Sequence, residues 1–528
     1  MIRKFLEHYI ICNILVLFLI SATLVLSTFV LPLAYSQESS PIPYWRTSGE
    51  GNIRLLWPSG IAVDSLSGNV YVADTGNSRI QLFSSNGTFL EKWGGYGRND
   101  TRMRFPQGIA VDQQENIYVA DTTNNRISAF SHSPIAEVSF SSEDGEIYGN
   151  DTRIKIERIY EELTFPTAVG FLGPNDIVVL ERQNNTIMRI VNGQMLDEPV
   201  LDLGNSTKIG SCVCDITILS DDNNGTSYAF VYYAEARVTE DNGETKLVDL
   251  LYRYDIIDGK FINPKLIFEM PTVSSALHNG GKLMIGPDNN VYLTIGDVDG
   301  RKTQAQNVKN GSLPDGSSAV LRFTPDGEPV DGGPLGNTSP LDRYYAYGIR
   351  NSFGIDYDPF TGNIWITDNG PEYSDELNLV RPGFNGGWRQ IMGFSSLDES
   401  FNLTDLEFFN STGKYYDPIF EWLDSIGVTD LVFVPSDKLG KEYQGNLFVG
   451  DINSGYLYRF LLNETRTGLL LDGSLSDGVA NTNVETVQTA FAKINGGGIT
   501  DLEVGPDGLI YIVSSNGKIL RLGSTDAN

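Results

Sequence analysis

Two neighbouring segments of this chain repeat each other almost residue for residue, and that repeat constrains the fold more than any other feature. The segments read "WPSGIAVDSLSGNVYVADTGNSRIQLF" at 57–83 and "FPQGIAVDQQENIYVADTTNNRISAF" at 105–130. Both alternate apolar and polar residues with the period of two that β-strands require, and turn-forming residues separate the strands. Looser copies of the pattern begin at Phe165, Cys214, His278, Arg350, Gly427 and Gly496. Repeating units of this kind are typical of β-propeller blades.

We therefore expect an all-β protein, a six-bladed β-propeller with a pair of extra blades before it. Abundant glycine (55), tyrosine (25) and phenylalanine (26) agree with many strands and tight turns. We place the pair of blades at 50–133, a polar linker at 134–153 and the six-bladed propeller at 154–525. Because two blades cannot close a ring, we expect the pair to form a separate small unit beside the six-bladed ring.

The innermost strand of each propeller blade begins beside the central channel, so the first residues of the repeat units meet there. His278, Arg350, Thr429 and Thr500 hold such positions. Loops and strand ends of a propeller carry function while the blades act as a scaffold. The channel mouth is therefore where we expect the functional groups, including one of the three histidines of the chain.

The first 36 residues differ in character from the rest. Arg3 and Lys4 precede an apolar run over residues 9–35 that ends in small residues. The run is longer than the ~7–15 apolar residues of a signal peptide and reaches the ~20 residues that span a bilayer. Residues 1–36 are predicted to be either a cleaved signal peptide or an N-terminal membrane anchor. Both alternatives place the rest of the protein in the extracellular space or on the outer face of the cytoplasmic membrane.

The formal net charge is −29, from 38 basic and 67 acidic residues. A surface this acidic repels phosphate backbones, which excludes nucleic acid as a partner class. Possible glycan acceptors of the form N-x-S/T agree with an exported chain. They begin at Asn86, Asn99, Asn150, Asn184, Asn205, Asn224, Asn310, Asn337, Asn402, Asn410 and Asn463.

After residue 36 the chain has two cysteines, Cys212 and Cys214, in "GSCVCDI". Two residues apart in a flat strand, they lie on the same face at a separation too long for an unstrained disulfide. A strained local disulfide, two buried thiols and a soft-metal site all stay open.

The first two repeats are similar to NHL repeats, because "PxGIAVD", "YVADT" and "NxRI" stand in register in both of them. The pairs Asp74/Arg79 and Asp121/Arg126 fall at the same place in the two copies. We interpret these pairs as structural braces of the turn between strands.

Four longer pieces of the propeller carry a second resemblance. They are "HNGGKLMIGPDNNVYLTIGD" from His278, "AVLRFTPDGEPV" from Ala319, "YGIRNSFGIDYDPFTGNIWITDNGP" from Tyr347 and "SDELNLVRPGFNGGW" from Ser374. With them the segment 163–522 resembles the soluble quinoprotein glucose dehydrogenases and aldose sugar dehydrogenases, the glucose/sorbosone dehydrogenase family. The resemblance implies a six-bladed propeller that binds pyrroloquinoline quinone (PQQ) and calcium and oxidises an aldose at its anomeric carbon by hydride transfer to PQQ.

The resemblance also assigns roles to residues. His278 would be the general base, a role that suits imidazole because its ordinary pKa is ~6.5. Arg350 would stabilise negative charge on the quinone, and Asn351 would hydrogen-bond its rim. Gly280 and Gly281 would let the backbone approach a planar ring.

The calcium assignment comes from the same resemblance. Gly370 and Pro371 of "TDNGP" match backbone carbonyls that hold the calcium of the cofactor. Calcium requires hard oxygen ligands of this kind. Asp375 and Glu376 would brace the loop or bind another calcium ion.

Several positions depart from the family pattern. Asn453 stands where the family has a lysine, and Gly498 and Thr500 stand where it has two arginines. Leu277 replaces the acidic residue before the histidine, and Gly210 stands where a glutamine is expected. PQQ carries three carboxylates, so the lost cations remove much of the expected charge pairing.

Two classes of function stay open from the sequence. The first is an exported PQQ-dependent sugar dehydrogenase, which His278, Arg350 and the Gly370–Pro371 loop favour. The second is a non-catalytic extracellular propeller that binds a glycan or a protein on a dehydrogenase-like scaffold, which the missing cations favour. The sequence identifies neither the aldose, nor the electron acceptor, nor the oligomeric state.

Overall fold

We describe the protein from a computed structural model of the chain. The described residues are 54–64, 68–98, 102–112, 116–130, 138–204, 213–221, 226–238, 245–271, 277–298 and 300–525. The strands belong to one compact unit, Leu55–Asn528. The segment 1–36 lies outside the described residues, and so do His132 and Cys212.

The two NHL repeats each form one antiparallel sheet, which we call blades N1 and N2. Blade N1 has the order β1 (Gly60–Val63), β2 (Val70–Asp74), β3 (Arg79–Phe83), β4 (Phe89–Gly94). Blade N2 has the order β5 (Pro106–Val111), β6 (Ile117–Asp121), β7 (Arg126–Phe130). The predicted braces are confirmed, because Arg79 Nε lies 2.8 Å from Asp74 Oδ2 and Arg126 Nε lies 2.8 Å from Asp121 Oδ2.

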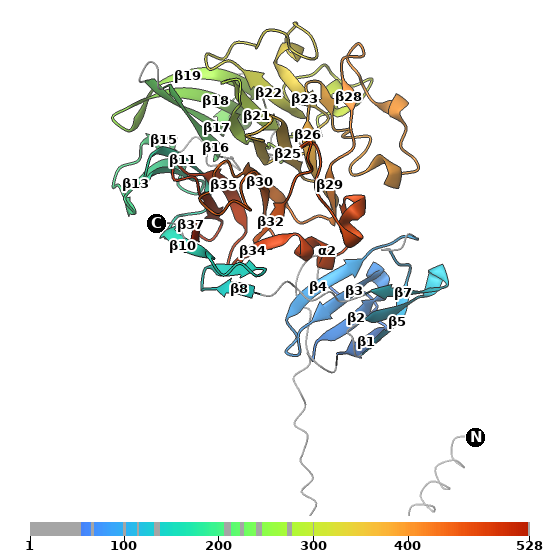
Figure 1. Cartoon of the computed structure of the whole chain (residues 1–528). Helices are drawn as coiled ribbons and strands as arrows, with labels where there is room; N and C mark the ends of the chain where they lie inside the picture. Colours follow the sequence, from blue (N-terminus) through green and yellow to red (C-terminus); the bar gives the residue numbers. More distant parts are fainter. Residues whose placement is uncertain are drawn as a thin grey trace, which may run out of the picture. The chain divides into compact units, whose positions relative to one another are not determined.

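Six further sheets form the propeller, and the chain is all-β as expected (Figure 1). In chain order, the first sheet consists of β11 (Pro166–Gly173), β12 (Asp176–Glu181), β13 (Thr186–Val191) and β14 (Gln194–Met195), with β15 (Leu201–Asp202) paired to β13. The second sheet consists of β16 (Val213–Asp221), β17 (Thr226–Val238), β18 (Thr245–Ile257) and β19 (Lys260–Pro271). The third sheet consists of β20 (Leu283–Ile285), β21 (Val291–Ile295), β22 (Ala319–Phe323), β23 (Tyr344–Tyr347), β27 (Phe384–Asn385) and β28 (Lys414–Tyr415).

The remaining three sheets complete the set. The fourth sheet consists of β24 (Gly354–Tyr357), β25 (Ile364–Asp368), β26 (Tyr373–Val380), β29 (Phe420–Asp424) and β33 (Val479–Ala480). The fifth sheet consists of β30 (Val428–Phe433), β31 (Leu447–Asp451), β32 (Tyr456–Phe460), β34 (Ala490–Ile494), β9 (Gly145–Tyr148) and β8 (Val138–Ser141). The sixth sheet consists of β35 (Ile499–Val504), β36 (Ile510–Ser514), β37 (Lys518–Ser524) and β10 (Ile154–Tyr160). The short helix α2 (Asn483–Gln488) precedes β34. The 3-10 turns are η1 (Thr75–Asn77), η2 (Thr122–Asn124), η4 (Gln304–Gln306), η5 (Leu341–Arg343), η6 (Ser395–Leu397), η7 (Leu403–Asp405) and η8 (Gly473–Asp477).

The six sheets close into a ring through their first strands. Each first strand contacts the next in the order β11, β16, β20, β24, β30, β35, and β35 returns to β11. These are the strands that begin the repeat units predicted from the sequence, so the six-bladed propeller is confirmed. The sheets of blades N1 and N2 are not among the six.

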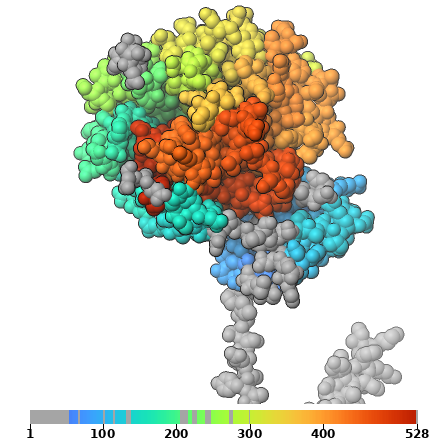
Figure 2. All heavy atoms as spheres, viewed as in Figure 1, coloured from blue at the N-terminus to red at the C-terminus, as the bar shows by residue number. Residues whose placement is uncertain are grey.

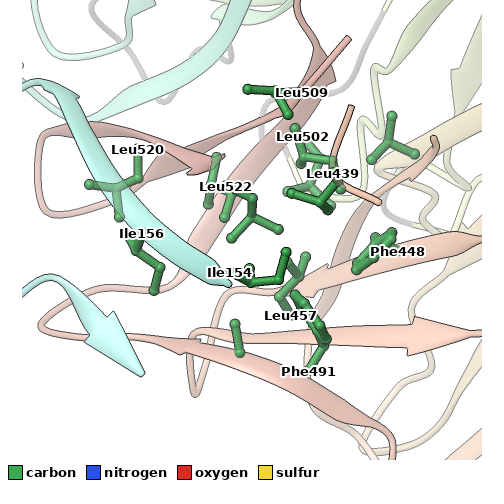
Figure 3. Packing of buried hydrophobic residues seen from close by; sticks show 14 of the residues in the cluster. Ile154, Ile156, Leu439, Phe448, Leu457, Phe491, Leu502, Leu509, Leu520 and Leu522 are labelled. Atoms are coloured by element: carbon green, nitrogen blue, oxygen red, sulfur yellow. The ribbon is translucent and has the colours of Figure 1, made fainter. Parts of the chain in front are cut away.

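The last blade combines both ends of the propeller sequence. Strand β10 pairs antiparallel with β37, so that Arg158 lies opposite Leu520. Figure 2 shows cyan residues of this early segment beside dark red residues of the C-terminal end. Buried side chains of both segments, including Ile154, Ile156 and Leu522, pack in one cluster with residues of the preceding blade (Figure 3). The ring is therefore held shut by hydrogen bonds and by an apolar core.

The segment 134–153 is not the plain linker that we expected. It contains β8 and β9, a hairpin whose second strand pairs with β34, so that Ile147 lies opposite Ala492. Ile147 is buried in the same cluster as Ile154. The alternating apolar residues of this acidic stretch thus add two outer strands to a propeller blade.

Aspartates of three first strands join their blades to the next one. Asp215 accepts the backbone N–H of Leu283, Asp430 accepts that of Leu502, and Asp501 accepts that of Val169. Lys282, directly before β20, lies among these carboxylates. Its Nζ is 2.7 Å from Asp430 Oδ2 and 3.7 Å from Asp215 Oδ1. One buried ammonium thus binds aspartates from three other blades in the channel.

Candidate active site

The backbone before β20 brings His278 to the channel. His278 has a φ of +59°, in the left-handed region that residues other than glycine seldom adopt. The next residue is anchored, since Asn279 Nδ2 donates to Asp249 Oδ1 at 2.8 Å. Gly280 has a φ of +60°, and a Cβ there would lie 2.9 Å from Ser352 O of the next blade. The glycine is therefore required by contact between blades.

His278 forms a polar chain with two residues that lie far from it in sequence. Its Nδ1 lies 2.7 Å from Asp297 Oδ1, and Trp388 Nε1 donates to Asp297 Oδ2 at 2.9 Å. Asp297 is buried, and the His278 side chain keeps 27% of its surface exposed. Because a carboxylate accepts, the Nδ1 carries the hydrogen and Nε2 keeps its lone pair.

Arg350 lies on the other side of that imidazole. Its Nη2 is 3.1 Å from His278 Nε2, and its Nη1 donates to Asn369 O at 2.8 Å and to Gly370 O at 2.7 Å. The guanidinium also lies over the ring of Trp388, 5.5 Å from its centroid. Arg350 and His278 are thus brought together as the sequence predicted.

Several buried polar atoms at this place have no hydrogen-bond partner among the described residues. They are Nε of Arg350, Oδ1 of Asn351 and Oδ1 of Asn279. The backbone of Arg350 and Asn351 is fixed, because both N–H groups donate to Asp368. Rigid side chains with unused hydrogen-bonding atoms are suited to receive a polar ligand.

A cavity of about 230 Å³ lies beside these residues, on the axis of the ring. Gly280, Gly281, Asn369, Lys282 and Asp215 line it. Its other lining residues are Phe165, Thr167, Arg182, Phe353, Gly427, Val428, Thr429, Ile452, Thr500 and Asp501. The predicted channel positions of Thr429 and Thr500 are therefore confirmed.

The residues predicted to hold calcium have other partners. Asp375 accepts hydrogen bonds from the backbone of Gly370, Ile426 and Gly427, and Glu376 accepts them from Gly393 N and Asn378 Nδ2. Asp375 therefore braces its loop. The carbonyl oxygen of Gly370 accepts a hydrogen bond from the guanidinium of Arg350. Pro371 is exposed beside it. Across the described ranges, no three histidine, cysteine or acidic side chains form a group that could hold a metal ion.

The three positions that lack a family cation, Asn453, Gly498 and Thr500, have different surroundings in the structure. Asn453 is exposed, and Thr500 Oγ1 donates to Pro166 O at 3.0 Å. A Cβ on Gly498 would lie 1.8 Å from Ile452 O, so this backbone excludes an arginine there. Arg182, exposed at the cavity and 5.7 Å from the centroid of the Phe165 ring, supplies a cation that sequence reasoning missed.

Sequence reasoning also missed three further residues of the site, Asp297, Trp388 and Lys282. A signal existed for Asp297, because Leu283 pairs with Leu293 and the same register carried outward brings His278 next to Asp297. Trp388 lies in the long connection between β27 and β28 and had no such local signal. Cys214 lies in β16, and its side chain is outside the described part of the chain.

Fold and site together define a six-bladed propeller with a His–Asp pair and an arginine at its channel mouth. The family model described as glucose/sorbosone dehydrogenase matches residues 163–521, and the chain belongs to this family. NHL repeats match residues 55–83 and 103–130.

Known proteins agree with this membership. Aldose sugar dehydrogenase YliI of Escherichia coli is 24% identical over 374 residues, 70% of this chain and 92% of that protein. The apo crystal structure of the soluble aldose sugar dehydrogenase from E. coli has a TM-score of 0.55 at 22% identity, covering 70% of this chain and 99% of that one. The PQQ-bound aldose sugar dehydrogenase of Streptomyces coelicolor has a TM-score of 0.50 at 20% identity, covering 71% and 99%. At these identities the structures establish the fold.

None of the helices in the described ranges has the length and apolarity needed to cross a membrane.

Proposed function

We propose that this protein is a PQQ-dependent sugar dehydrogenase that oxidises an aldose at its anomeric carbon. The observation that carries the proposal is the arrangement of His278, which has Nδ1 on Asp297 and Nε2 3.1 Å from Arg350 Nη2. A base held by a buried carboxylate next to a fixed cation is what removal of a hydroxyl proton together with hydride transfer requires.

The residues present fit the quinone. Arg350 Nε and Asn351 Oδ1 are buried without partners, and Gly280 and Gly281 line the adjacent cavity. Arg182 stands at the same cavity, exposed, with its guanidinium over the Phe165 ring. An arginine there can receive a carboxylate in a charge-assisted pair. It partly makes up for the family cations absent at Asn453, Gly498 and Thr500.

When bound, PQQ would supply the two-electron acceptor for the hydride that leaves the anomeric carbon. His278 Nε2 would take the proton of the anomeric hydroxyl, and the loss of this proton together with the hydride leaves a lactone. Asp297 would hold the imidazole in the tautomer that has its lone pair at Nε2 and would stabilise the imidazolium once it forms. Arg350 would place its positive charge beside the reacting centre. Hydrogen bonds from its guanidinium to the backbone carbonyls of Asn369 and Gly370 would hold the side chain in that position.

The family also uses calcium, and the described side chains do not fit that ion in their present arrangement. Calcium takes about six to eight oxygen ligands. Here Gly370 O binds Arg350, and the carboxylates of Asp375 and Glu376 accept protein donors. The calcium assignment of Gly370, Pro371 and Glu376 therefore stays a prediction from the resemblance, and no step above uses the ion.

Reconstitution tests the proposal. The purified full chain would be titrated with PQQ, with and without calcium chloride, and the cofactor absorbance followed before and after a panel of aldoses is added. We expect saturable binding of PQQ and a change to the spectrum of the reduced cofactor with at least one aldose. Bound PQQ that no aldose reduces would contradict the dehydrogenase assignment.

One observation favours the second candidate, a non-catalytic propeller that binds a glycan or protein. The backbone at Gly498 leaves no room for a family arginine, and the Asn453 side chain is neutral. Failure of PQQ to bind at any concentration in the titration would support this candidate instead.

The location is a proposal of its own. We propose from residues 1–36 that the protein acts outside the cytoplasmic membrane. Finding the intact chain in the soluble cytoplasmic fraction would contradict it.

A further inference from the structure

The two NHL blades differ in how much of their faces is covered, although their sequences are almost the same. In blade N1, Tyr71 and Ile80 are 1% and 0% exposed, because they pack in one cluster with Ile117 and Val119 of blade N2. The equivalent residues of blade N2 are Tyr118 and Ile127. They are 40% and 66% exposed in the whole chain. Blade N2 therefore presents an uncovered copy of a face that is buried in blade N1.

We call this open surface the tyrosine face of blade N2. It consists of alternate residues of its three strands, and the carboxylate of Asp112 lies at its margin, where it accepts the Tyr118 hydroxyl at 3.1 Å. The residues are Ala110, Tyr118, Ala120, Ile127 and Ala129.

Blade N1 leaves the complementary face open along its inner strand. In blade N2, Ile109 and Val111 of β5 pack against the cluster shared with blade N1. Their equivalents in β1, Ile61 and Val63, are 68% and 59% exposed. We call these two residues the inner edge of blade N1. The rest of that sheet face is already covered, since Val70 and Val72 are buried next to Leu55.

A pair of glycines marks where one blade approaches the next. A Cβ on Gly60 of β1 would lie 2.2 Å from Gln107 O and 3.3 Å from Ile109 Cγ2, so the β5 strand passes directly over it. Gly108 holds the same position in β5. A Cβ there would meet only Ala120 of its own sheet, at 3.5 Å. Blade N2 thus keeps the gap that receives a following strand, and no strand among the described residues fills it.

We infer that a second copy of this chain fills that gap, with the inner edge of its blade N1 against the tyrosine face of blade N2. The contact between blades N1 and N2 within one chain is the template, because Tyr118 and Ile127 repeat one of its sides and Ile61 with Val63 repeats the inner-strand part of the other. An interface of this head-to-tail kind closes into a ring when its rotation allows. Propellers have roughly four to eight blades, so about two to four copies would close one.

The test measures the mass of the full chain, purified in mild detergent, by native mass spectrometry. Wild type is expected to be an oligomer. Ile127→Asp removes the tyrosine face and Ile61→Asp removes the inner edge, so each variant alone is expected to be a monomer. Mixed in equal amounts, the two variants retain one intact interface between them and are expected to form a dimer.

Three outcomes overturn the inference. The first is a monomeric wild type. The second is an Ile61→Asp variant that assembles like wild type, as it would if two tyrosine faces paired with each other. The third is a mixture of the two variants that stays monomeric. Leu313→Asp is the matched control, because Leu313 is a propeller residue that is 72% exposed and lies outside both faces. Both isoleucines are exposed, and thermal unfolding of each variant checks that its blades are folded.

Discussion

Nδ1 of His278 lies 2.7 Å from Oδ1 of Asp297, and the two residues stand at the open ends of the two strands of one hairpin. The blade that carries the imidazole therefore also fixes its orientation. The second oxygen of Asp297 accepts the Trp388 indole, which lies under the Arg350 guanidinium. The four side chains form one rigid unit at the channel mouth.

Replacing Asp297 by asparagine should therefore remove activity without removing the cofactor. The new amide would donate to Nδ1 and place the imidazole hydrogen on Nε2, where a base needs a lone pair. We expect kcat with an aldose to fall by ~10²–10⁴-fold, as for loss of the base in His278→Ala, with PQQ affinity unchanged. Steady-state kinetics and a PQQ titration check this. Asp288→Asn, in an exposed turn, is the control. Full activity of Asp297→Asn would show that the carboxylate does not set the tautomer.

Arg182→Gln should weaken PQQ binding. A hydrogen bond to a charged group contributes roughly 1.5–3 kcal/mol, so we expect Kd to rise by about 10- to 150-fold. Absorbance titration measures it. Arg182→Lys should retain part of the affinity, and Asn453→Lys should raise affinity in the wild-type background by restoring a family cation. An unchanged Kd in Arg182→Gln would mean that this arginine does not contact the cofactor.

Lys282→Met should destabilise the propeller. The ammonium lies 2.7 Å from Asp430 and binds Asp501, and its removal leaves buried carboxylates without a cation. Breaking a buried ion pair in this way costs about 3–5 kcal/mol. Chemical unfolding followed by tryptophan fluorescence measures the loss. Lys438→Met, at an exposed lysine, should change little. Equal stability of the two variants would contradict the role of Lys282 as the charge partner in the channel.

The free energy of unfolding of the protein should fall as pH rises from about 4 to about 7. Burial raises the pKa of both Asp215 and Asp249 to about 7, whereas an unfolded aspartate titrates at ~3.9. Across this window the folded protein binds more protons than the unfolded chain, so the free energy of unfolding decreases with rising pH. Thermal unfolding over a pH series checks the sign. Asp249→Asn should flatten the slope, and a wild-type stability that rises over the window would contradict the prediction.

Three fragments test how the ring is closed. The fragment 138–525 keeps β8, β9 and β10 and should unfold cooperatively. The fragment 151–525 loses only the outer hairpin and should unfold at a lower temperature. The fragment 163–525 also loses β10, which exposes the edge of β37 and removes Ile154 and Ile156 from the core. We expect it to aggregate. Calorimetry compares them, and equal stability of all three fragments would show that β10 is dispensable.

The sequence predicted most of the ring, because each blade repeats the same local pattern. The strands that begin at Pro166, Val428 and Ile499 follow from that pattern. Strand β10 carries a similar alternation, "IKIERIY", but its partner lies at the other end of the propeller. Local periodicity identifies a strand and does not identify a partner so distant, which is also why β8 and β9 were assigned to a linker.

The site was predicted in part. His278 and Arg350 came from the family resemblance, and the structure brings their side chains together. Asp215, Asp430 and Asp501 recur at one position of the repeat units, in "CDIT", "TDLV" and "TDLE", and this recurrence could have indicated a shared role. Their burial around Lys282 could not be predicted, because one sequence does not show which charged residues a channel encloses.

The opposition of Arg158 and Leu520 across β10 and β37 has a consequence for the synthesis of the protein. Strand β10 is synthesised early and must wait, unpaired, until β37 has been synthesised. A chain that stops before β37 leaves the edges of β10 and β36 unpaired and part of the apolar core uncovered, and chaperones and proteases detect such surfaces. Ring closure thus depends on the late synthesis of β37, because the edge strand β10 of the last blade finds its partner only when β37 is present.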